Sequence, residues 1–531
     1  MKPSILLCGA FWIMVTSPVP AQPGHPEEFQ KRPNIILIVA DDHARQAVSA
    51  YDSTLIRTPS IDRIAEEGLL FSNAFVTNAI CGPSRAVMLT GKYSHKNGLR
   101  DNRDRFDGDQ PTFPKFLQET GYQTMVIGKW HLRSLPQGFD YWSILPGQGE
   151  YYNPRFIRLG DTVRLTGYVT DLITDVAIEA LRARDSSKPF CLLYHHKAPH
   201  RNWMPNIPQL ELFNDRTFVP PENFFDTYAT RSRAAAEQEM EIGRHLFDGF
   251  DLKLPIAYVR QSGRDTAIVP GWDAVGAWAA TLRSLTDHQR QAWERAYGPE
   301  NMAFVQNPPE GRELALWKYQ RYLKDYLRCV VSLDENVGRL LAFLDSEGLS
   351  RNTLVVYTSD QGFFLGEHGW FDKRFMYEES LGIPLMVRYP VGIEAGSKSD
   401  ALVLNLDLAP TILQLAGVPI PEDVQGKSLV PLFQAEPGVP WRSSIYYHYY
   451  EYPHGWHAVK KHNGVRTDRY KLIHFYDDID AWELYDLQTD PHEMINLYED
   501  PGHQEVVGQL KRELQKLRTQ LGDEEEESET K

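Results

Sequence analysis

The sequence predicts an α/β protein with a mostly parallel central sheet, followed by a smaller α+β subdomain. Continuous apolar runs at 34–40 and 353–359 are typical of parallel strands that are buried on both faces. Segments with helical periodicity, such as 170–184 and 314–344, separate the apolar runs, as expected of alternating strands and helices. Beyond about residue 426, aromatic-rich runs alternate like antiparallel strands, which indicates a second, smaller layer.

Length and charge limit the classes of function. The 531 residues suffice for a large core, and we expect one large domain plus a smaller one. The formal net charge of −15 argues against nucleic acid as a partner, and it would repel a polyanionic substrate. Local cations must therefore hold any anionic ligand. Residues 522–531 carry part of this acidity and are predicted to form a disordered tail.

The N-terminus has the pattern of a secretory signal. Residues 1–21 combine Lys2, an apolar run and the small-residue exit VPA, so we expect a cleaved signal peptide and a secreted or periplasmic protein. The apolar run is too short to span a bilayer comfortably. Because no later stretch resembles a transmembrane segment, we expect no stable membrane insertion.

Three cysteines remain after the signal peptide, namely Cys81, Cys191 and Cys329. So few cysteines exclude a fold that depends on several disulfides. If Cys81 is modified, one pair is left, and the sequence leaves open whether Cys191 and Cys329 are bonded.

The first predicted strand, 34–40, ends in two aspartates, Asp41 and Asp42. Open α/β sheets bind their ligands beyond the carboxyl ends of the strands. Two adjacent carboxylates at such a place repel each other and need a cation. A helix cap or a turn would explain one aspartate, but it explains two less well.

The stretch CGPSRAVMLTG at 81–91 places a thiol where a helix is predicted to begin. Pro83 has the fixed φ that favours a first helical turn, and Ser84 has a side chain that can cap one. Cys81 should therefore lie beside exposed N–H groups, which attract anions, and Arg85 adds a two-pronged donor. A small buried cysteine at a helix start is the alternative interpretation.

Two further strand ends carry basic side chains. The predicted strand at 124–128 leads into Lys129 and His131, which share a face because they are alternate residues. The predicted strand at 189–194 is followed by His200, Arg201, Asn202 and Trp203. These residues offer, in order, an acid, a guanidinium, an amide and a flat apolar ring, which together suit a sugar sulfate.

The strand predicted at 353–359 repeats the design of the first, because it ends in Asp360 and Gln361. Together with Asp41 and Asp42 these residues offer three carboxylates and one amide oxygen. Such hard ligands suit Ca²⁺ or Mg²⁺ better than zinc, which favours His and Cys. We expect a calcium site, with Mg²⁺ as the alternative.

The remaining elements complete the predicted domain plan. We expect helices at 61–67, 112–120, 407–418 and 504–521, and strands at 71–77 and 384–390. The predicted parts of the chain are a signal peptide at 1–21, a catalytic domain at 22–425 with an insertion at about 205–312 that walls the pocket, an α+β subdomain at 426–521 and a tail at 522–531.

Two motifs resemble those of a known family. The run C-x-P-S-R followed by Thr90 and Gly91 resembles the signature of the type I sulfatases, and FFLGEHGWFDKRFMYEES resembles their second signature. The resemblance extends from about Pro33 to the last helix and implies an alkaline-phosphatase-like sandwich. KAPHRNWMP and KLIHFYDDIDAWELYD are most similar to bacterial exo-acting N-acetylglucosamine-6-O-sulfatases.

The resemblance implies a mechanism and a set of site residues. A maturation enzyme would oxidise Cys81 to Cα-formylglycine, and a sulfated carbohydrate would be the substrate. The implied catalytic residues are Cys81, Arg85, Lys129, His131, His200 and Lys373. The implied metal ligands are Asp41, Asp42, Cys81, Asp360 and Gln361, although many sulfatases have histidine or asparagine in place of the glutamine. The expected substrate contacts are Arg201, Trp203, His462 and Arg466.

Other functions remain open on the sequence. The chain could act on another sugar or aryl sulfate, or it could be a phosphodiesterase or phosphonate hydrolase of the same superfamily. From another class, it could be a carbohydrate-binding pseudoenzyme that keeps the scaffold without catalysis. An intact Cys81 thiol in the native protein would favour the pseudoenzyme.

Overall fold

The computed structural model describes residues 32–267, 269, 271–434 and 438–523. The predicted signal peptide and residues 524–531 of the predicted tail lie outside these ranges. No helix within the described ranges is long and apolar enough to cross a membrane.

The core of the molecule is a ten-stranded sheet with the strand order β13-β2-β12-β9-β1-β8-β4-β5-β6-β7. Its five central strands, β9, β1, β8, β4 and β5, are parallel, whereas β12, β6 and β7 pair in antiparallel fashion. The predicted mostly parallel sheet is confirmed. The strands are β1 (Asn34–Ala40), β2 (Leu69–Phe71), β4 (Gln123–Lys129), β5 (Tyr141–Leu145), β6 (Arg155–Arg158), β7 (Asp161–Arg164), β8 (Phe190–His195), β9 (Thr353–Ser359), β12 (Leu385–Arg388) and β13 (Ser397–Ser399).

The two faces of this sheet bury separate apolar layers. Along β1, Ile35, Leu37 and Val39 face one layer, whereas Ile36 and Ile38 face the other. All five side chains are at most 1% exposed. Burying each such side chain contributes about 1.5–3 kcal/mol. This two-sided burial explains why the strand is a continuous apolar run rather than an alternating one.

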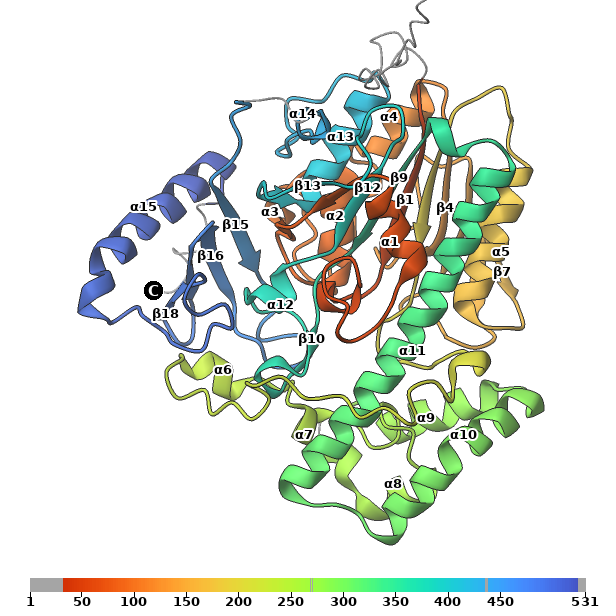
Figure 1. Cartoon of the computed structure of the whole chain (residues 1–531), viewed down its shortest axis with the longest axis vertical. Helices are drawn as coiled ribbons and strands as arrows, with labels where there is room; N and C mark the ends of the chain where they lie inside the picture. The colour runs from red at the N-terminus through yellow and green to blue at the C-terminus, as the bar shows by residue number, and fades with distance from the viewer. Residues whose placement is uncertain (1–31, 268, 270, 435–437, 524–531) are drawn as a thin grey trace, which may run out of the picture.

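Helices cover both faces, which makes the domain a three-layered sandwich (Figure 1). The apolar side chains of α1 (Pro59–Glu66), α5 (Val169–Arg182) and α11 (Gly311–Ser346) join one layer. Those of α2 (Cys81–Thr90), α4 (Phe113–Glu119) and α13 (Leu408–Leu415) join the other. Cys191 and Cys329 are free and belong to opposite layers, so they do not form a disulfide.

The predicted insertion forms a helical region at the bottom of Figure 1. Its helices are α6 (Arg233–Glu237), α7 (Ile242–His245), α8 (Ile256–Ser262), α9 (Ala274–Ser284) and α10 (Asp287–Gln306). α10 begins with a capping box, in which Thr286 and Gln289 satisfy each other's backbone N–H groups. This box fixes the turn between α9 and α10.

The C-terminal region forms a separate antiparallel sheet, at the left of Figure 1, as predicted. Its strands are β15 (Ser444–Tyr449), β16 (His462–Thr467), β17 (Tyr470–Phe475) and β18 (Ala481–Asp486), and α15 (Gln504–Leu521) packs against it. The prediction of a disordered tail from residue 522 is wrong at its start. Asp523 is 5% exposed, and its carboxylate lies 2.7 Å from the His448 ring.

Two further pairs of short strands form sheets of their own. Strand β3 (Ala74–Phe75) pairs with β14 (Val403–Leu404), and β10 (Phe364–Leu365) pairs with β11 (Phe371–Asp372). The remaining short helices are α3 (Ser94–Asn97), α12 (Glu378–Leu381) and α14 (Val430–Phe433).

A glycine at the end of β4 gives a test of this packing. Gly128 has φ of +102°, and a Cβ placed there would lie 1.8 Å from the carbonyl oxygen of His195 on β8. We expect Gly128→Ala to lower the free energy of unfolding by about 3 kcal/mol or more, because strain and a backbone clash add. Gly160→Ala is the control, since Gly160 has φ of +103° with open space around its Cβ position. It should lose about 1 kcal/mol. Equal losses in chemical unfolding would contradict the clash.

Candidate active site

The functional side chains lie at the carboxyl edge of the parallel sheet. Asp41 and Asp42 follow β1, Lys129 ends β4, and Asp360 and Gln361 follow β9. These strands lie close together in the sheet, so residues from three distant parts of the chain meet. All five side chains are fully buried. The predicted convergence of strand ends is confirmed.

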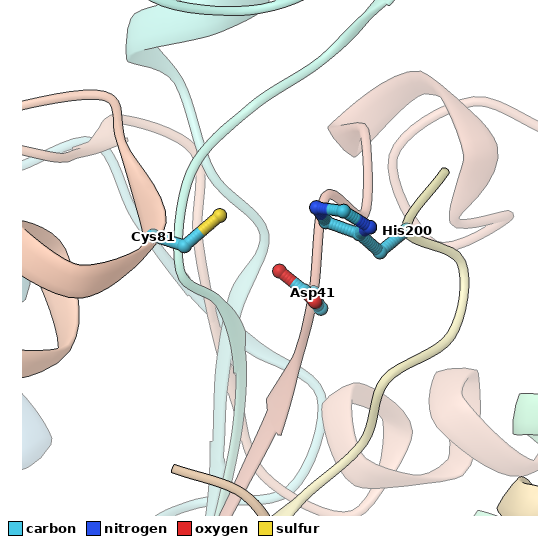
Figure 2. Close-up of side chains that lie close together, drawn as sticks. All are labelled: Asp41, Cys81 and His200. Carbon is cyan, nitrogen blue, oxygen red and sulfur yellow. The ribbon is translucent and has the colours of Figure 1, made fainter. Parts of the chain in front are cut away.

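Cys81 opens helix α2 and faces this cluster. In Figure 2 its sulfur points toward Asp41 and His200, and ligand atoms of the three residues lie within 4.8 Å of one another. Ser84 does not cap the helix as expected, because Ile80 is the N-cap and the Ser84 hydroxyl accepts a bond from Asn405 at 2.9 Å.

Burial makes the encoded thiol unreactive. It raises the pKa of Cys81 to about 12, although Lys129 and Lys373 act in the opposite direction. Because the thiolate is the nucleophilic form, an unmodified Cys81 would be almost inert at neutral pH. The encoded thiol is therefore poorly suited to act as a nucleophile without modification.

Each carboxylate of the cluster is paired with a cation. Asp41 pairs with Lys129, whose ammonium also lies 2.5 Å from the Gln148 amide oxygen. Asp42 lies 2.6 Å from Lys373, and Asp360 lies 2.8 Å from Arg85. Arg85 also donates to the Lys129 carbonyl at 2.9 Å. These cations surround Cys81 and are suited to neutralise the oxygens of an anionic ester.

The carboxylates retain capacity for a cation of their own. Asp41, Asp42 and Asp360 form a group whose oxygens lie within 4.8 Å of one another. Burial raises the pKa of Asp42 to about 6 and that of Asp360 to about 7, and the charge of Asp41 adds to both shifts. Within the described ranges, Asp41 Oδ1 and Gln361 Oε1 are buried without a hydrogen-bond partner. Unpartnered hard oxygens beside crowded carboxylates fit Ca²⁺ or Mg²⁺.

Two histidines differ in how they are held. His200 Nδ1 lies 2.6 Å from the Arg201 carbonyl, which can only accept, so Nδ1 carries the hydrogen. Its Nε2 lies 3.7 Å from Asp42 and faces the cluster. His131 has a buried Nδ1 without a hydrogen-bond partner in the described part of the chain.

A cavity of about 690 Å³ opens above Cys81. The insertion contributes Phe250, Trp272 and three residues of α9, and the C-terminal region contributes Trp456 and His457. Its lining residues are Cys81, Asn102, Arg103, Gln148, Gly149, Glu150, Tyr151, Tyr152, Lys197, His200, Arg201, Asn202, Met204, Phe250, Trp272, Ala280, Thr281, Ser284, Asp372, Lys373, Arg374, Glu451, Gly455, Trp456 and His457. A polar floor under aromatic walls is suited to a sugar.

One of the four expected substrate contacts lines this cavity. The Arg201 guanidinium is bound by Asp251 at 2.5 Å and lies 4.9 Å from the centre of the Phe371 ring and 5.6 Å from that of Trp456. Such a side chain is held rigidly in the wall. It therefore presents a fixed surface to a ligand.

The predictions for Trp203, His462 and Arg466 are wrong. Trp203 is fully buried, with its ring centre 4.7 Å from that of Tyr322. His462 is fully buried, and its ring nitrogens bond to backbone atoms of Met376 and Lys460. Arg466 pairs with Glu378 at 3.2 Å and lines a different groove. Packing and ion pairing use these side chains within the fold.

Several lining residues were missed from the sequence. Asp372 and Arg374 flank Lys373, so the charged triplet was a usable signal. Gln148 and Trp272 lie in segments without any motif, and no signal indicated them. His195 was also missed, although it ends β8, and its Nδ1 lies 3.3 Å from Arg85.

The fold and the site together define a hydrolase of anionic esters, in which buried cations and a carboxylate cluster surround one modifiable cysteine. Residues 33–418 match the sulfatase family, and residues 366–520 match the family described as N-sulphoglucosamine sulphohydrolase, C-terminal. The chain belongs to the sulfatase family. This family generally uses a formylglycine and a divalent cation.

Individual relatives cover almost the whole chain. It is 50% identical over 498 residues to the N-acetylglucosamine-6-O-sulfatase of Bacteroides thetaiotaomicron, covering 92% of this chain and 87% of that protein. The human N-acetylglucosamine-6-sulfatase is 27% identical over 449 residues, covering 79% of this chain and 67% of the human protein. A structure solved with its substrate, D-glucosamine-2-N,6-O-disulfate, superposes with a TM-score of 0.90 at 49% identity, covering 94% of this chain and 100% of that one. These matches confirm the expected alkaline-phosphatase-like sandwich.

The cation site can be tested by binding. We expect Ca²⁺ to stabilise the metal-free protein by about 2.7 kcal/mol when free Ca²⁺ is about 100 times its Kd. Asp360→Ala should stay folded, lose this stabilisation and be nearly inactive. Asp407→Ala is a matched control, because it also removes a buried carboxylate bound to an arginine, Arg442. Thermal unfolding with and without Ca²⁺ measures both. An unchanged Ca²⁺ response in Asp360→Ala would remove Asp360 from the site.

Proposed function

We propose that this chain hydrolyses the 6-O-sulfate ester of N-acetylglucosamine in glycosaminoglycan or mucin glycans. One observation carries the proposal: the N-acetylglucosamine-6-O-sulfatase of Bacteroides thetaiotaomicron is 50% identical over 92% of this chain. The match covers 92% of this chain, and the residues that line the cavity lie between Cys81 and His457. Substrate choice depends on those walls.

The proposed nucleophile is a formylglycine made from Cys81 by a maturation enzyme. The raised pKa of the buried thiol supports this, because the encoded cysteine is a poor nucleophile. As a hydrate, the modified residue carries two hydroxyls. One hydroxyl loses its proton and its oxygen bonds to sulfur, while the bond from sulfur to the sugar oxygen breaks and that oxygen takes up a proton. The second hydroxyl then loses its proton and expels sulfate, which restores the aldehyde.

We propose that the site binds Ca²⁺, with Mg²⁺ as the alternative. The cation would be held by Asp41, Asp42, Asp360 and Gln361 together with residue 81. The cation supplies positive charge that makes a nearby hydroxyl more acidic and neutralises sulfate oxygens. Arg85, Lys129 and Lys373 would hold the remaining sulfate oxygens. Their buried ion pairs keep these three cations in place before the ester binds.

Two histidines would move the protons. His200 would protonate the departing sugar oxygen from Nε2, since its Nδ1 hydrogen is bound to the Arg201 carbonyl. His131 would take the proton of the second hydroxyl. The buried, unpartnered Nδ1 of His131, as judged within the described ranges, supports a role in proton transfer.

The predicted signal peptide supports a secreted or periplasmic enzyme. We also propose the domain plan expected from the sequence: a catalytic part at 22–425, a C-terminal subdomain at 426–521 and an acidic tail. Sulfated glycans outside the cytoplasm are the proposed partners, and we expect no nucleic acid partner.

A substrate panel tests the proposed specificity. We expect sulfate release from 6-sulfated N-acetylglucosamine and none from the 2-, 3- or 4-sulfated monosaccharides. Mass spectrometry of the peptide with residue 81 should show the formylglycine in active enzyme. Full activity with an unoxidised peptide would refute the nucleophile. Faster turnover of phosphate diesters than of sulfate esters would favour the phosphodiesterase alternative.

The role of His200 makes a separate prediction. His200→Ala should lower kcat on 6-sulfated N-acetylglucosamine about 10²–10⁴-fold, the usual contribution of a general acid. An aryl sulfate with an acidic phenol as leaving group should lose much less, because its departing oxygen needs no proton. Steady-state kinetics on both substrates measure the difference. Equal losses on both substrates would contradict the proposal that His200 protonates the leaving group.

A further inference from the structure

Lys197 lies in the wall of the cavity and has no role in the proposed mechanism. It follows β8 by two residues and is 3% exposed. Its ammonium lies 3.3 Å from the Arg201 carbonyl and 4.7 Å from the centre of the Tyr151 ring. Both contacts are weak for a buried cation, because neither partner carries a negative charge.

The absence of a counter-ion separates Lys197 from the other buried lysines. In the described part of the chain, each of the others has a carboxylate within 4.0 Å: Lys92, Lys129, Lys253, Lys318, Lys373, Lys460 and Lys471. No carboxylate of the described ranges lies that close to Lys197. Burying an unpaired charge is costly. Accordingly, burial and then repulsion from Lys129 lower the pKa of Lys197 to about 8, so it is still mostly charged at neutral pH.

The same contrast holds within the cavity. Four other lysines and arginines line it, and the protein neutralises each one: Arg103 with Asp101, Arg201 with Asp251, Lys373 with Asp42, and Arg374 with Asp372 and Glu451. A neutral donor could bond the Arg201 carbonyl at lower cost. The charge of Lys197 is therefore better explained by an anion that enters with the ligand.

Lys197 lies on the Nδ1 side of the His200 ring, and the carboxylate cluster lies on the Nε2 side. Lys197 Nζ and His200 Nδ1 both bond the Arg201 carbonyl, at 3.3 and 2.6 Å, whereas His200 Nε2, across the ring, lies 3.7 Å from Asp42. Tyr151, which lies beneath the ammonium, donates its hydroxyl to the His200 carbonyl at 2.6 Å. Lys197 thus belongs to the side of the cavity where the sugar, rather than its ester sulfate, would lie.

We propose that Lys197 is a second anion-binding contact of this cavity, which takes a negatively charged substituent of the substrate other than the scissile sulfate. The assignment rests on the proposed function, because it places a 6-sulfated glucosamine in the cavity. Two sources of this chemistry fit: an N-sulfate on the same sugar, or the carboxylate of an adjoining uronate. Lys197 thereby adds a preference for more highly charged glycans.

The test compares substrates that differ in one charge. The substrates are N-acetylglucosamine 6-sulfate, glucosamine 2-N,6-O-disulfate, and a disaccharide of N-acetylglucosamine 6-sulfate linked to a uronate. Lys197→Gln removes the charge but keeps a donor for the Arg201 carbonyl. We expect kcat/KM to fall about tenfold or more on whichever charged substrate uses Lys197, as for a lost charge-assisted bond. On N-acetylglucosamine 6-sulfate it should change less than about threefold, since no such bond is lost.

Arg103→Gln is the matched control, because it removes one charge from the same cavity at a position that is paired with Asp101. It should change kcat/KM of all three substrates by a similar factor. A selective loss on the disulfate identifies the N-sulfate as the ligand, and a selective loss on the disaccharide identifies the uronate. Equal losses on all substrates with Lys197→Gln, or no loss on any, would overturn the assignment.

The unmutated enzyme gives a second test in case Lys197→Gln does not fold. KM should be lower for at least one charged substrate than for N-acetylglucosamine 6-sulfate. Equal KM values for all three would reject the assignment while leaving the proposed function intact. If the enzyme hydrolyses none of them, the proposed function itself is wrong, and the assignment falls with it.

Discussion

Three buried ion pairs at the carboxyl edge of the sheet are the constraint on which the rest of the site depends. Asp41 with Lys129, Asp42 with Lys373, and Asp360 with Arg85 bring together four distant parts of the chain. Removing one partner of a buried pair typically costs about 3–5 kcal/mol, because the other charge stays buried. The charges that hold this part of the fold together are thus the charges that would bind a cation and a sulfate.

The cavity above these pairs is built from parts that the sheet does not specify. The insertion and the C-terminal region supply its aromatic walls, and the segment after β8 supplies His200, Arg201 and Lys197. Most charges in these walls are neutralised inside the protein, as Arg201 is by Asp251. A fixed and nearly neutral wall favours a sugar, while the unpaired ammonium of Lys197 adds selectivity for charge.

Sequence reasoning succeeded where local pattern and chemistry coincide. Apolar runs ending in Asp41, Asp42, Asp360 and Lys129 placed these side chains at one edge, because parallel strands end on the same side of a sheet. It failed for Trp203, His462 and Arg466, whose residue types suit a sugar but whose positions are filled by core packing or by an ion pair. It also missed Gln148, because a single amide in a loop has no pattern.

The sequence alone determined the fold class, the cysteine at the start of α2, and the carboxylates and amide at the strand ends. Each of these depends on periodicity or on residues adjacent along the chain. Only the tertiary structure decided which polar side chains reach the cavity and which are neutralised before a ligand arrives. The physical reason is that burial and pairing depend on contacts between residues far apart in the chain. Lys197 and Lys253, for example, are both buried, but Asp325 lies 3.0 Å from the ammonium of Lys253.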